Sequence, residues 1–124
     1  MHSVQNDPDY LLVSVTDKVD QQSLYEAQSD LMLHPEYPHK NSLWVFDEGC
    51  VCDFSSLGMF EMLGRIKTFF PIHGTKEKAA MFAKNFTFYS MVKLFCEEAE
   101  QEGIPFTMKP FRKFDDAKSW LAGV

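Results

Sequence analysis

The chain alternates between short apolar runs and longer segments in which apolar residues recur at helical spacing. Runs rich in apolar and β-branched residues are typical of buried strands, and they lie at residues 10–15, 43–46, 79–83 and 106–108. Segments with helical periodicity follow these runs in turn, and they begin near Asp20, Ser55 or Ser56, Thr87 and Asp115. Because parallel strands need long crossover connections, this order predicts an α/β fold with a mainly parallel sheet and about four helices.

Turn, capping and breaking residues predict the boundaries of these elements. Residues 2–5 are expected to form an edge strand, joined to the next strand by the turn residues 6–9 in an antiparallel N-terminal hairpin. The expected helix N-caps are Asp20, Ser55 or Ser56, and Thr87. The first three helices are expected to end at about Leu33, Phe70 and Gly103. Proline has no N–H to continue a helix, so the second helix is expected to stop at Pro71.

The last predicted helix has a single apolar face, formed by Ala117, Trp120 and Leu121. The helix can dock on the sheet only through this face, and Asp115 and Asp116 suit its positive end. We therefore expect Trp120 to be buried, together with Phe95 of the preceding helix.

The composition predicts one soluble domain over residues 1–124. Hydrophobic residues make up 45% of the chain and charged residues 24%, which supports a core without disulfides. Three cysteines cannot all pair, which suits a reducing compartment. No secretory signal is recognisable, and no apolar stretch approaches the roughly 20 residues of a membrane helix. We expect a cytoplasmic protein without membrane insertion.

The net charge of −6 disfavours nucleic acid as a partner, because phosphate binding needs a basic face. Residues 1–64 carry 11 acids and 2 bases, whereas residues 65–124 carry 7 acids and 10 bases. Opposite charges of this kind could bring two copies together in a homodimer. The simpler interpretation is that both halves interleave in one fold, so that the asymmetry averages out.

The C-terminal third resembles the SpoIIAA-like family, relatives of the STAS domain. Residues 78–83 look like the family's penultimate strand and residues 88–95 like its long helix. Residues 111–121 are similar to its closing signature, an aromatic-Arg pair, an acidic helix start and an Ala-x-x-Trp-Leu ending. The resemblance implies a fold shared with anti-sigma-factor antagonists and, more distantly, with lipid-binding CRAL-TRIO domains. It implies a fold more strongly than an activity.

The same resemblance draws attention to Ser55 and Ser56. STAS antagonists carry an Asp-Ser-Ser-Gly type motif between a strand and a helix, and phosphorylation of one serine there releases a partner. A phosphate at this place would bind free helix N–H groups. Here Phe54 separates Asp53 from the serines, and Leu57 replaces the glycine. The alternative is a serine that only caps the helix.

The second helix is more apolar than one core contact requires. Its apolar residues spread over about half of the helical wheel, whereas a core-facing stripe needs only about 100°. The excess predicts either an apolar ligand pocket or a partner surface, for which we select Met59, Met62, Ile66 and Phe69. A helix wedged between the sheet and a neighbouring helix is the alternative. Gly64 within this helix suggests a close approach of another helix or a ligand.

Sites for metals, cofactors or catalysis are not predicted. Cys50 and Cys52 form an isolated Cys-x-Cys, whereas zinc needs four ligands, so these thiols and Cys96 are interpreted as structural. The histidines lie in expected loops or at the terminus without paired spacing, at positions His2, His34, His39 and His73. No convergent acid, base and nucleophile are present, so we do not expect an enzyme.

Two functional hypotheses remain. The first is a non-catalytic regulatory module that contacts a protein partner or a second copy around the Ser55/Ser56 helix start. The second is a CRAL-TRIO-like carrier or sensor of an apolar or lipid-like small ligand. A packed interior would favour the first, and a closed apolar cavity of several hundred Å³ would favour the second.

Overall fold

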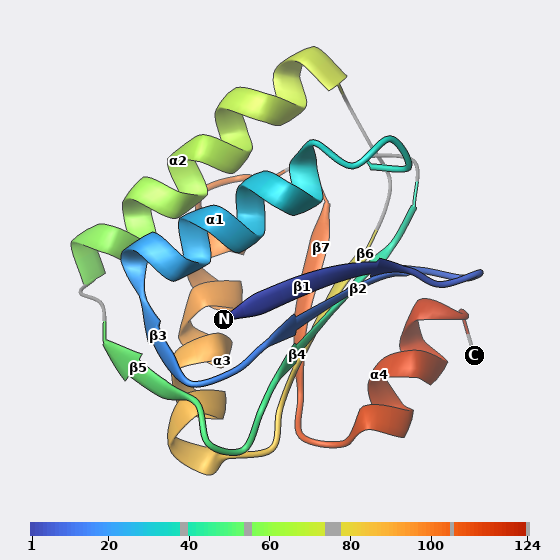
Figure 1. Cartoon of the computed structure of the whole chain (residues 1–124). Helices are drawn as coiled ribbons and strands as arrows, with labels where there is room; N and C mark the ends of the chain where they lie inside the picture. The colour runs from blue at the N-terminus through green and yellow to red at the C-terminus, as the bar shows by residue number, and fades with distance from the viewer. Residues whose placement is uncertain (38–39, 54–55, 74–77, 105, 124) are drawn as a thin grey trace.

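The computed structural model describes residues 1–37, 40–53, 56–73, 78–104 and 106–123, without the side chains of 52–53, 56–57, 59–60 and 69–73. Five strands form the main sheet in the order β1-β2-β4-β6-β7 (Figure 1). They are β1 (His2–Asn6), β2 (Leu11–Val15), β4 (Ser42–Phe46), β6 (Lys78–Ala83) and β7 (Thr107–Phe111). The β1–β2 pair is antiparallel and the other pairs are parallel, which confirms the predicted fold class.

Within the described residues, four helices cover the two faces of this sheet. They are α1 (Gln21–Met32), α2 (Ser56–His73), α3 (Phe86–Gln101) and α4 (Phe114–Leu121). The helices α1, α2 and α3 lie on one face, and α4 lies on the other (Figure 1). A small parallel sheet of β3 (Lys18–Asp20) and β5 (Val51–Asp53) leads into α1 and α2. The sequence pattern did not predict it, because three-residue strands carry no apolar run.

Two of the predicted helix boundaries are confirmed by their hydrogen bonds. The Asp20 carboxylate accepts a bond of 2.8 Å from the backbone N–H of Ser23, and the Ser23 hydroxyl accepts one from the Asp20 backbone N–H. This reciprocal capping box starts α1. At the end of α3, Gly103 takes a φ of +74°, a left-handed conformation that costs glycine little.

Two other boundary predictions are wrong. The N-cap of α3 is Asn85 and not Thr87, since the Asn85 side-chain oxygen accepts a bond of 3.2 Å from the N–H of Phe88. Helix α2 does not stop at Pro71 but continues to His73. Proline's fixed φ is compatible with a helix, so the missing N–H removes one hydrogen bond without ending the helix.

The sheet separates two apolar clusters. The larger one, beneath α1, α2 and α3, contains Phe95, which is 7% exposed as expected. The smaller one, beneath α4, is formed by Leu43, Ala80, Ala117 and Leu121. Trp120 is only half-buried against this cluster, so its predicted burial is wrong. Its ring packs against Phe111 with a centroid distance of 5.6 Å, and Lys78 covers part of its surface at 5.3 Å.

Candidate functional site

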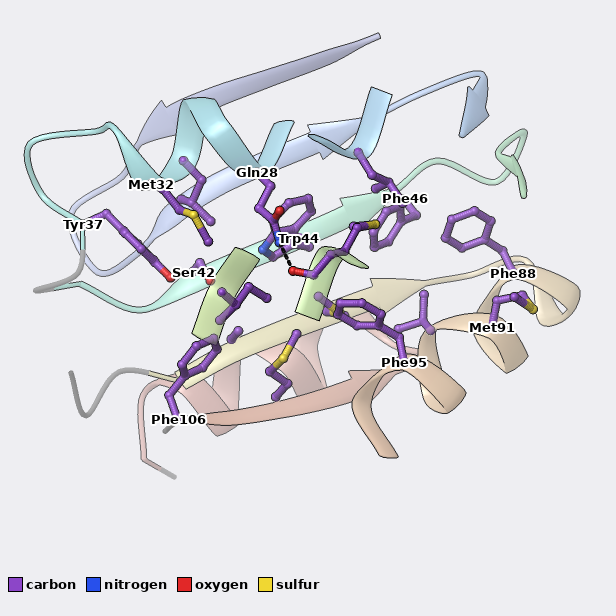
Figure 2. Close-up of a pocket in the computed structure, with 18 residues that line it drawn as sticks. Gln28, Met32, Tyr37, Ser42, Trp44, Phe46, Phe88, Met91, Phe95 and Phe106 are labelled. Atoms are coloured by element: carbon purple, nitrogen blue, oxygen red, sulfur yellow. Dashed lines mark hydrogen bonds between the residues drawn. The ribbon is translucent and has the colours of Figure 1, made fainter. Parts of the chain in front are cut away.

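An apolar cavity lies between the main sheet and the helices α1, α2 and α3 (Figure 2). Its volume is about 60 Å³, and it is partly open to the surface. The described residues that line it are Leu24, Gln28, Leu31, Met32, Tyr37, Ser42, Trp44, Phe46, Met62, Ile66, Ala79, Met81, Phe88, Met91, Val92, Phe95, Phe106 and Met108. The lining comes from three helices, three strands and two connecting segments, so the fold as a whole builds this space.

The strand register places the floor of the cavity. Trp44 of β4 pairs with Met81 of β6, so both side chains point to the same face of the sheet. Phe46, two residues after Trp44, shares that face and packs against Phe88 of α3 with ring centroids 4.7 Å apart. Trp44 and Phe46 stack at 6.1 Å. These aromatic rings form a rigid wall, because each is held by neighbours in the sheet or in α3.

Methionines form much of the remaining lining. Five of the seven methionines in the chain lie here, namely Met32, Met62, Met81, Met91 and Met108. Methionine is unbranched and flexible, and it is typical of surfaces that adapt to different occupants. A lining of this kind can change shape more readily than one of branched or aromatic side chains.

One buried amide faces the cavity. Gln28 of α1 is 4% exposed, and its Nε2 donates a hydrogen bond of 3.4 Å to the backbone oxygen of Met62 in α2. Its Oε1 is buried and has no hydrogen-bond partner among the described residues. Figure 2 draws Gln28 among the residues that line the cavity, with the bond to Met62 as a dashed line.

The described lining contains no charged side chain. Its polar groups belong to Gln28, Tyr37, Ser42 and the indole of Trp44. No group of three or more His, Cys, Asp or Glu that could hold a metal ion occurs within the described part of the chain. The cavity therefore has the chemistry of a site for a neutral, mainly apolar molecule.

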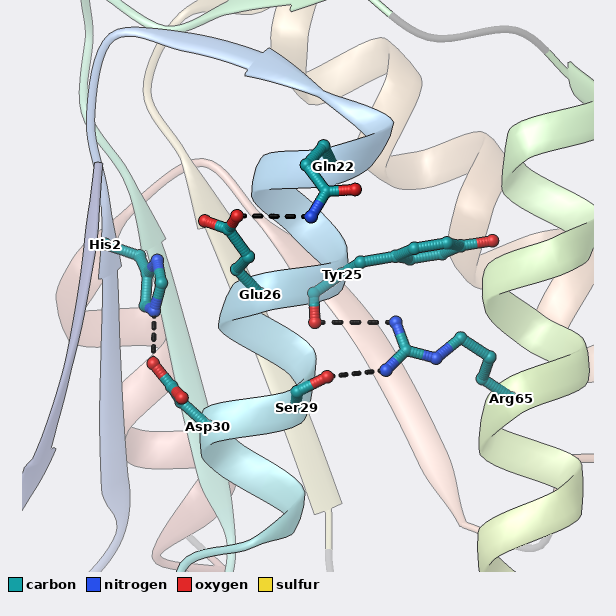
Figure 3. Close-up of polar contacts among 7 residues, drawn as sticks. All are labelled: His2, Gln22, Tyr25, Glu26, Ser29, Asp30 and Arg65. Carbon is teal, nitrogen blue, oxygen red and sulfur yellow. Dashed lines mark hydrogen bonds and ion pairs between the residues drawn. The ribbon is translucent and has the colours of Figure 1, made fainter.

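Polar side chains connect α1 and α2 outside the cavity (Figure 3). Arg65 of α2 lies over the ring of Tyr25 at 4.3 Å, and it donates hydrogen bonds to the Tyr25 backbone oxygen and the Ser29 hydroxyl. One turn earlier, Glu61 accepts hydrogen bonds from Gln21 and from the Tyr25 hydroxyl. The Arg65 bonds are part-buried, whereas those of Glu61 are exposed, so Glu61 contributes less to holding the helix pair together.

The second helix also contacts α3. Lys67 forms an ion pair of 3.5 Å with Glu102, the residue that caps the C-terminus of α3. Both side chains are well exposed, so this pair adds little stability. Side-chain contacts thus connect α2 to α1 and α3, while Met62, Leu63 and Ile66 anchor it in the core.

The structure brings two of the selected α2 residues to the cavity. Met62 and Ile66 are each 4% exposed and line it. The side chains of Met59 and Phe69 are not among those that the structure describes. Ser55 also lies outside the described residues.

Of the helix start selected from the sequence, the structure describes only the backbone of Ser56. Ser56 is the first residue of α2, but its side chain is not described. The interpretation of Ser55 and Ser56 as an anion or phosphorylation site therefore stays a prediction.

The sequence interpretation missed Gln28, Trp44 and Met81. A signal for Gln28 was present, because Leu24, Ala27, Gln28 and Leu31 share one helical stripe at spacings of three and four. When an apolar stripe faces the core, a polar residue within the stripe is buried with it. The roles of Trp44 and Met81 depend on strand register, which the sequence pattern does not specify.

Two of the three cysteines are described with their side chains, and that of Cys52 lies outside the described residues. Cys50 and Cys96 are buried free thiols, and desolvation raises the pKa of Cys96 to about 12. Burial, assisted by Asp47, also raises the pKa of Cys50, so neither thiol is activated as a nucleophile.

Two expectations about positions in or near α2 are wrong. A Cβ on Gly64 would meet nothing within 4 Å, because this glycine lies on the outer face of α2. The close approach occurs instead at Gly58, where a Cβ would lie 2.9 Å from the Gln21 side chain of α1. His73 lies within α2 and not in a loop. His39 lies outside the described residues.

None of the described helices combines the length and the apolar character that crossing a membrane requires.

Comparison with known proteins supports the fold. No protein-family model matches the chain, and no curated protein matches it in sequence. An uncharacterised protein of the DUF3478 family from Shewanella loihica PV-4, which has a SpoIIAA-like fold, is similar in structure with a TM-score of 0.51. The match covers 98% of this chain and 92% of that one at 15% identity. At this identity the likeness concerns the fold alone. The chain thus has the SpoIIAA-like fold that the sequence resemblance implied.

Proposed function

We propose that the protein is a non-catalytic sensor module that binds a compact, neutral, apolar molecule in the cavity between the sheet and the helices α1, α2 and α3. The observation that carries this proposal is the lining, in which five methionines surround a buried space without any described charge. An enzyme would instead need convergent acid and base groups beside the bound molecule.

The size of the cavity favours a small ligand over a lipid. Pockets for drug-sized molecules measure roughly 300–1,000 Å³, whereas this cavity measures about 60 Å³. An engineered protein cavity that binds benzene measures about 150 Å³. A ligand of that size would enter here only if methionine side chains change rotamer and the covering helix shifts.

This need for adjustment favours a sensor over a carrier. The floor of the cavity is formed by β4 and β6, which are hydrogen-bonded to neighbouring strands on both sides. Helix α2, which contributes Met62 and Ile66, is held to its neighbouring helices by side-chain contacts, which are part-buried at Arg65 and exposed at Glu61 and Lys67. A ligand that widens the space would therefore move α2 relative to a fixed sheet. Such a movement would report occupancy to a partner.

The proposal is tested by NMR of protein labelled with ¹³C at the methionine methyl groups, during titration with toluene. We expect the signals of the five cavity methionines to shift saturably. The signal of Met1, which is 81% exposed, should stay in place and serves as the internal control. Unspecific binding to the surface would shift Met1 together with the others.

A matched pair of variants locates the binding. Ala79 lines the cavity, whereas Ala80, the next residue of β6, packs beneath α4 on the opposite face. Ala79→Val should abolish the toluene response, and Ala80→Val should retain it. The proposal is wrong if neither toluene nor a longer apolar probe such as hexane shifts the cavity methionines of the wild-type protein.

A further inference from the structure

The amide of Gln28 has a defined orientation. Its nitrogen and oxygen are similar in size, but the group that faces the Met62 backbone oxygen must be the nitrogen, because a carbonyl oxygen only accepts hydrogen bonds. The side-chain Oε1 is therefore the atom left without a partner. The orientation follows from hydrogen-bond chemistry and from the position of α2.

A buried acceptor without a partner is unusual. Most buried polar side-chain atoms in folded proteins have at least one hydrogen-bond partner. Gln28 is 4% exposed, so bulk water does not solvate its Oε1. A single trapped water would need two to four polar partners. Besides Gln28, the polar groups of the described lining are those of Tyr37, Ser42 and the Trp44 indole, and none of them is bonded to Oε1. An acceptor left open in this way suits a donor that arrives with the occupant of the cavity.

Resting on the proposed function, we infer that the ligand is a neutral apolar compound with a hydrogen-bond donor, such as an alcohol or a phenol, and that Gln28 Oε1 accepts this hydrogen bond. An anion is disfavoured for two reasons. A carboxylate or phosphate oxygen would be repelled by Oε1, and the described lining offers no cation to compensate it. The apolar body of the ligand would contact the methionines and the aromatic wall.

Phenol and toluene test this inference, because they have nearly the same shape but only phenol donates a hydrogen bond. Water solvates phenol much better than toluene, so an apolar cavity without an acceptor would prefer toluene. We expect the wild-type protein to bind phenol at least as tightly as toluene, measured by the same methionine-methyl signals. In Gln28→Leu, toluene should be preferred, and the ratio of the two dissociation constants should change by at least tenfold.

Gln28→Met provides a second variant with nearly the original side-chain length and no amide oxygen. The same change of preference in either folded variant supports the inference. If the wild-type protein prefers toluene, the inference is wrong, and the hydrogen-bond partner of Oε1 is then only a trapped water. An unchanged ratio in the variants would overturn it too. In both of these cases the cavity still binds apolar probes, whereas failure of the proposed function would leave the cavity methionines unshifted by toluene and hexane.

Discussion

Ala79→Val should stabilise the protein, although most substitutions of buried residues destabilise. Ala79 is 4% exposed and points into the cavity from β6. Valine adds two methyl groups, and burial of each is worth about 0.8 kcal/mol. The empty space sets an independent upper limit on this gain in stability. A cavity costs about 24 cal/mol per Å³, so filling about 60 Å³ would recover about 1.4 kcal/mol. Rotamer restriction reduces the gain, so we expect about 1 kcal/mol.

Ala80→Val is the matched control for this substitution. Ala80 is fully buried in the same strand, but it belongs to the cluster with Ala117 and Leu121 of α4 and does not line the apolar cavity. The added methyl groups would overpack this interface, which typically costs about 1–3 kcal/mol. Both substitutions have the same strand propensity and the same change in volume. The difference between them therefore measures the empty space on the two faces of the sheet.

The free energies of unfolding are best measured by urea denaturation, with thermal melting as a second method. For a chain of this length, a gain of about 1 kcal/mol corresponds to a rise in Tm of about 3–5 °C. We expect Ala79→Val to unfold at higher urea concentration than the wild type and Ala80→Val at lower. An equal loss of stability in both variants would refute the reasoning, because it would show that the space beside Ala79 is not available to a side chain.

The N-termini of α1 and α3 provide two further predictions. Asn85→Ala should lower the free energy of unfolding by about 1 kcal/mol, whereas Thr87→Ala should stay within about 0.5 kcal/mol of wild type in urea denaturation. Equal losses of stability in the two variants would show that Asn85 is not the cap. The pKa of Asp20 is lowered by hydrogen bonds from the backbone N–H and the hydroxyl of Ser23, so its charge stabilises the fold above the ordinary aspartate pKa of 3.8. That stabilisation is lost as the pH falls through the lowered pKa. The stability difference between wild type and Asp20→Asn should therefore narrow in urea denaturation below about pH 4, and a constant difference would contradict this assignment.

Features determined by local chemistry could be predicted from the sequence. The cap at Asp20 and the left-handed Gly103 depend on residues within a few positions of each other, and both were predicted correctly. The alternation of main strands and helices along the chain also followed from the sequence, because buried parallel strands are continuous apolar runs. The cap of α3 was missed although its signal was local, since asparagine is at least as good a cap as threonine.

Features determined by pairing between distant segments could not be predicted in this way. The small sheet pairs Val19 with Cys52, in segments too short to carry a strand pattern. Trp120 looked like a core residue because its helix has one apolar face, but α4 is a short helix and leaves part of the ring to Lys78 and Lys109. The cavity itself depends on the register that sets Trp44 beside Met81. No single segment contains that information.

The two functional hypotheses from the sequence involve the same helix. Ser56 begins α2, and Met62 and Ile66, about two and three turns further on, line the cavity. A helix moves nearly as a rigid body, because its backbone hydrogen bonds are internal. If a ligand displaces Met62 and Ile66 from the sheet, the start of the helix moves with them and the surface around Ser56 changes. The proposed sensor therefore does not compete with a partner-binding role at the helix start, because α2 would couple an occupied cavity to that surface.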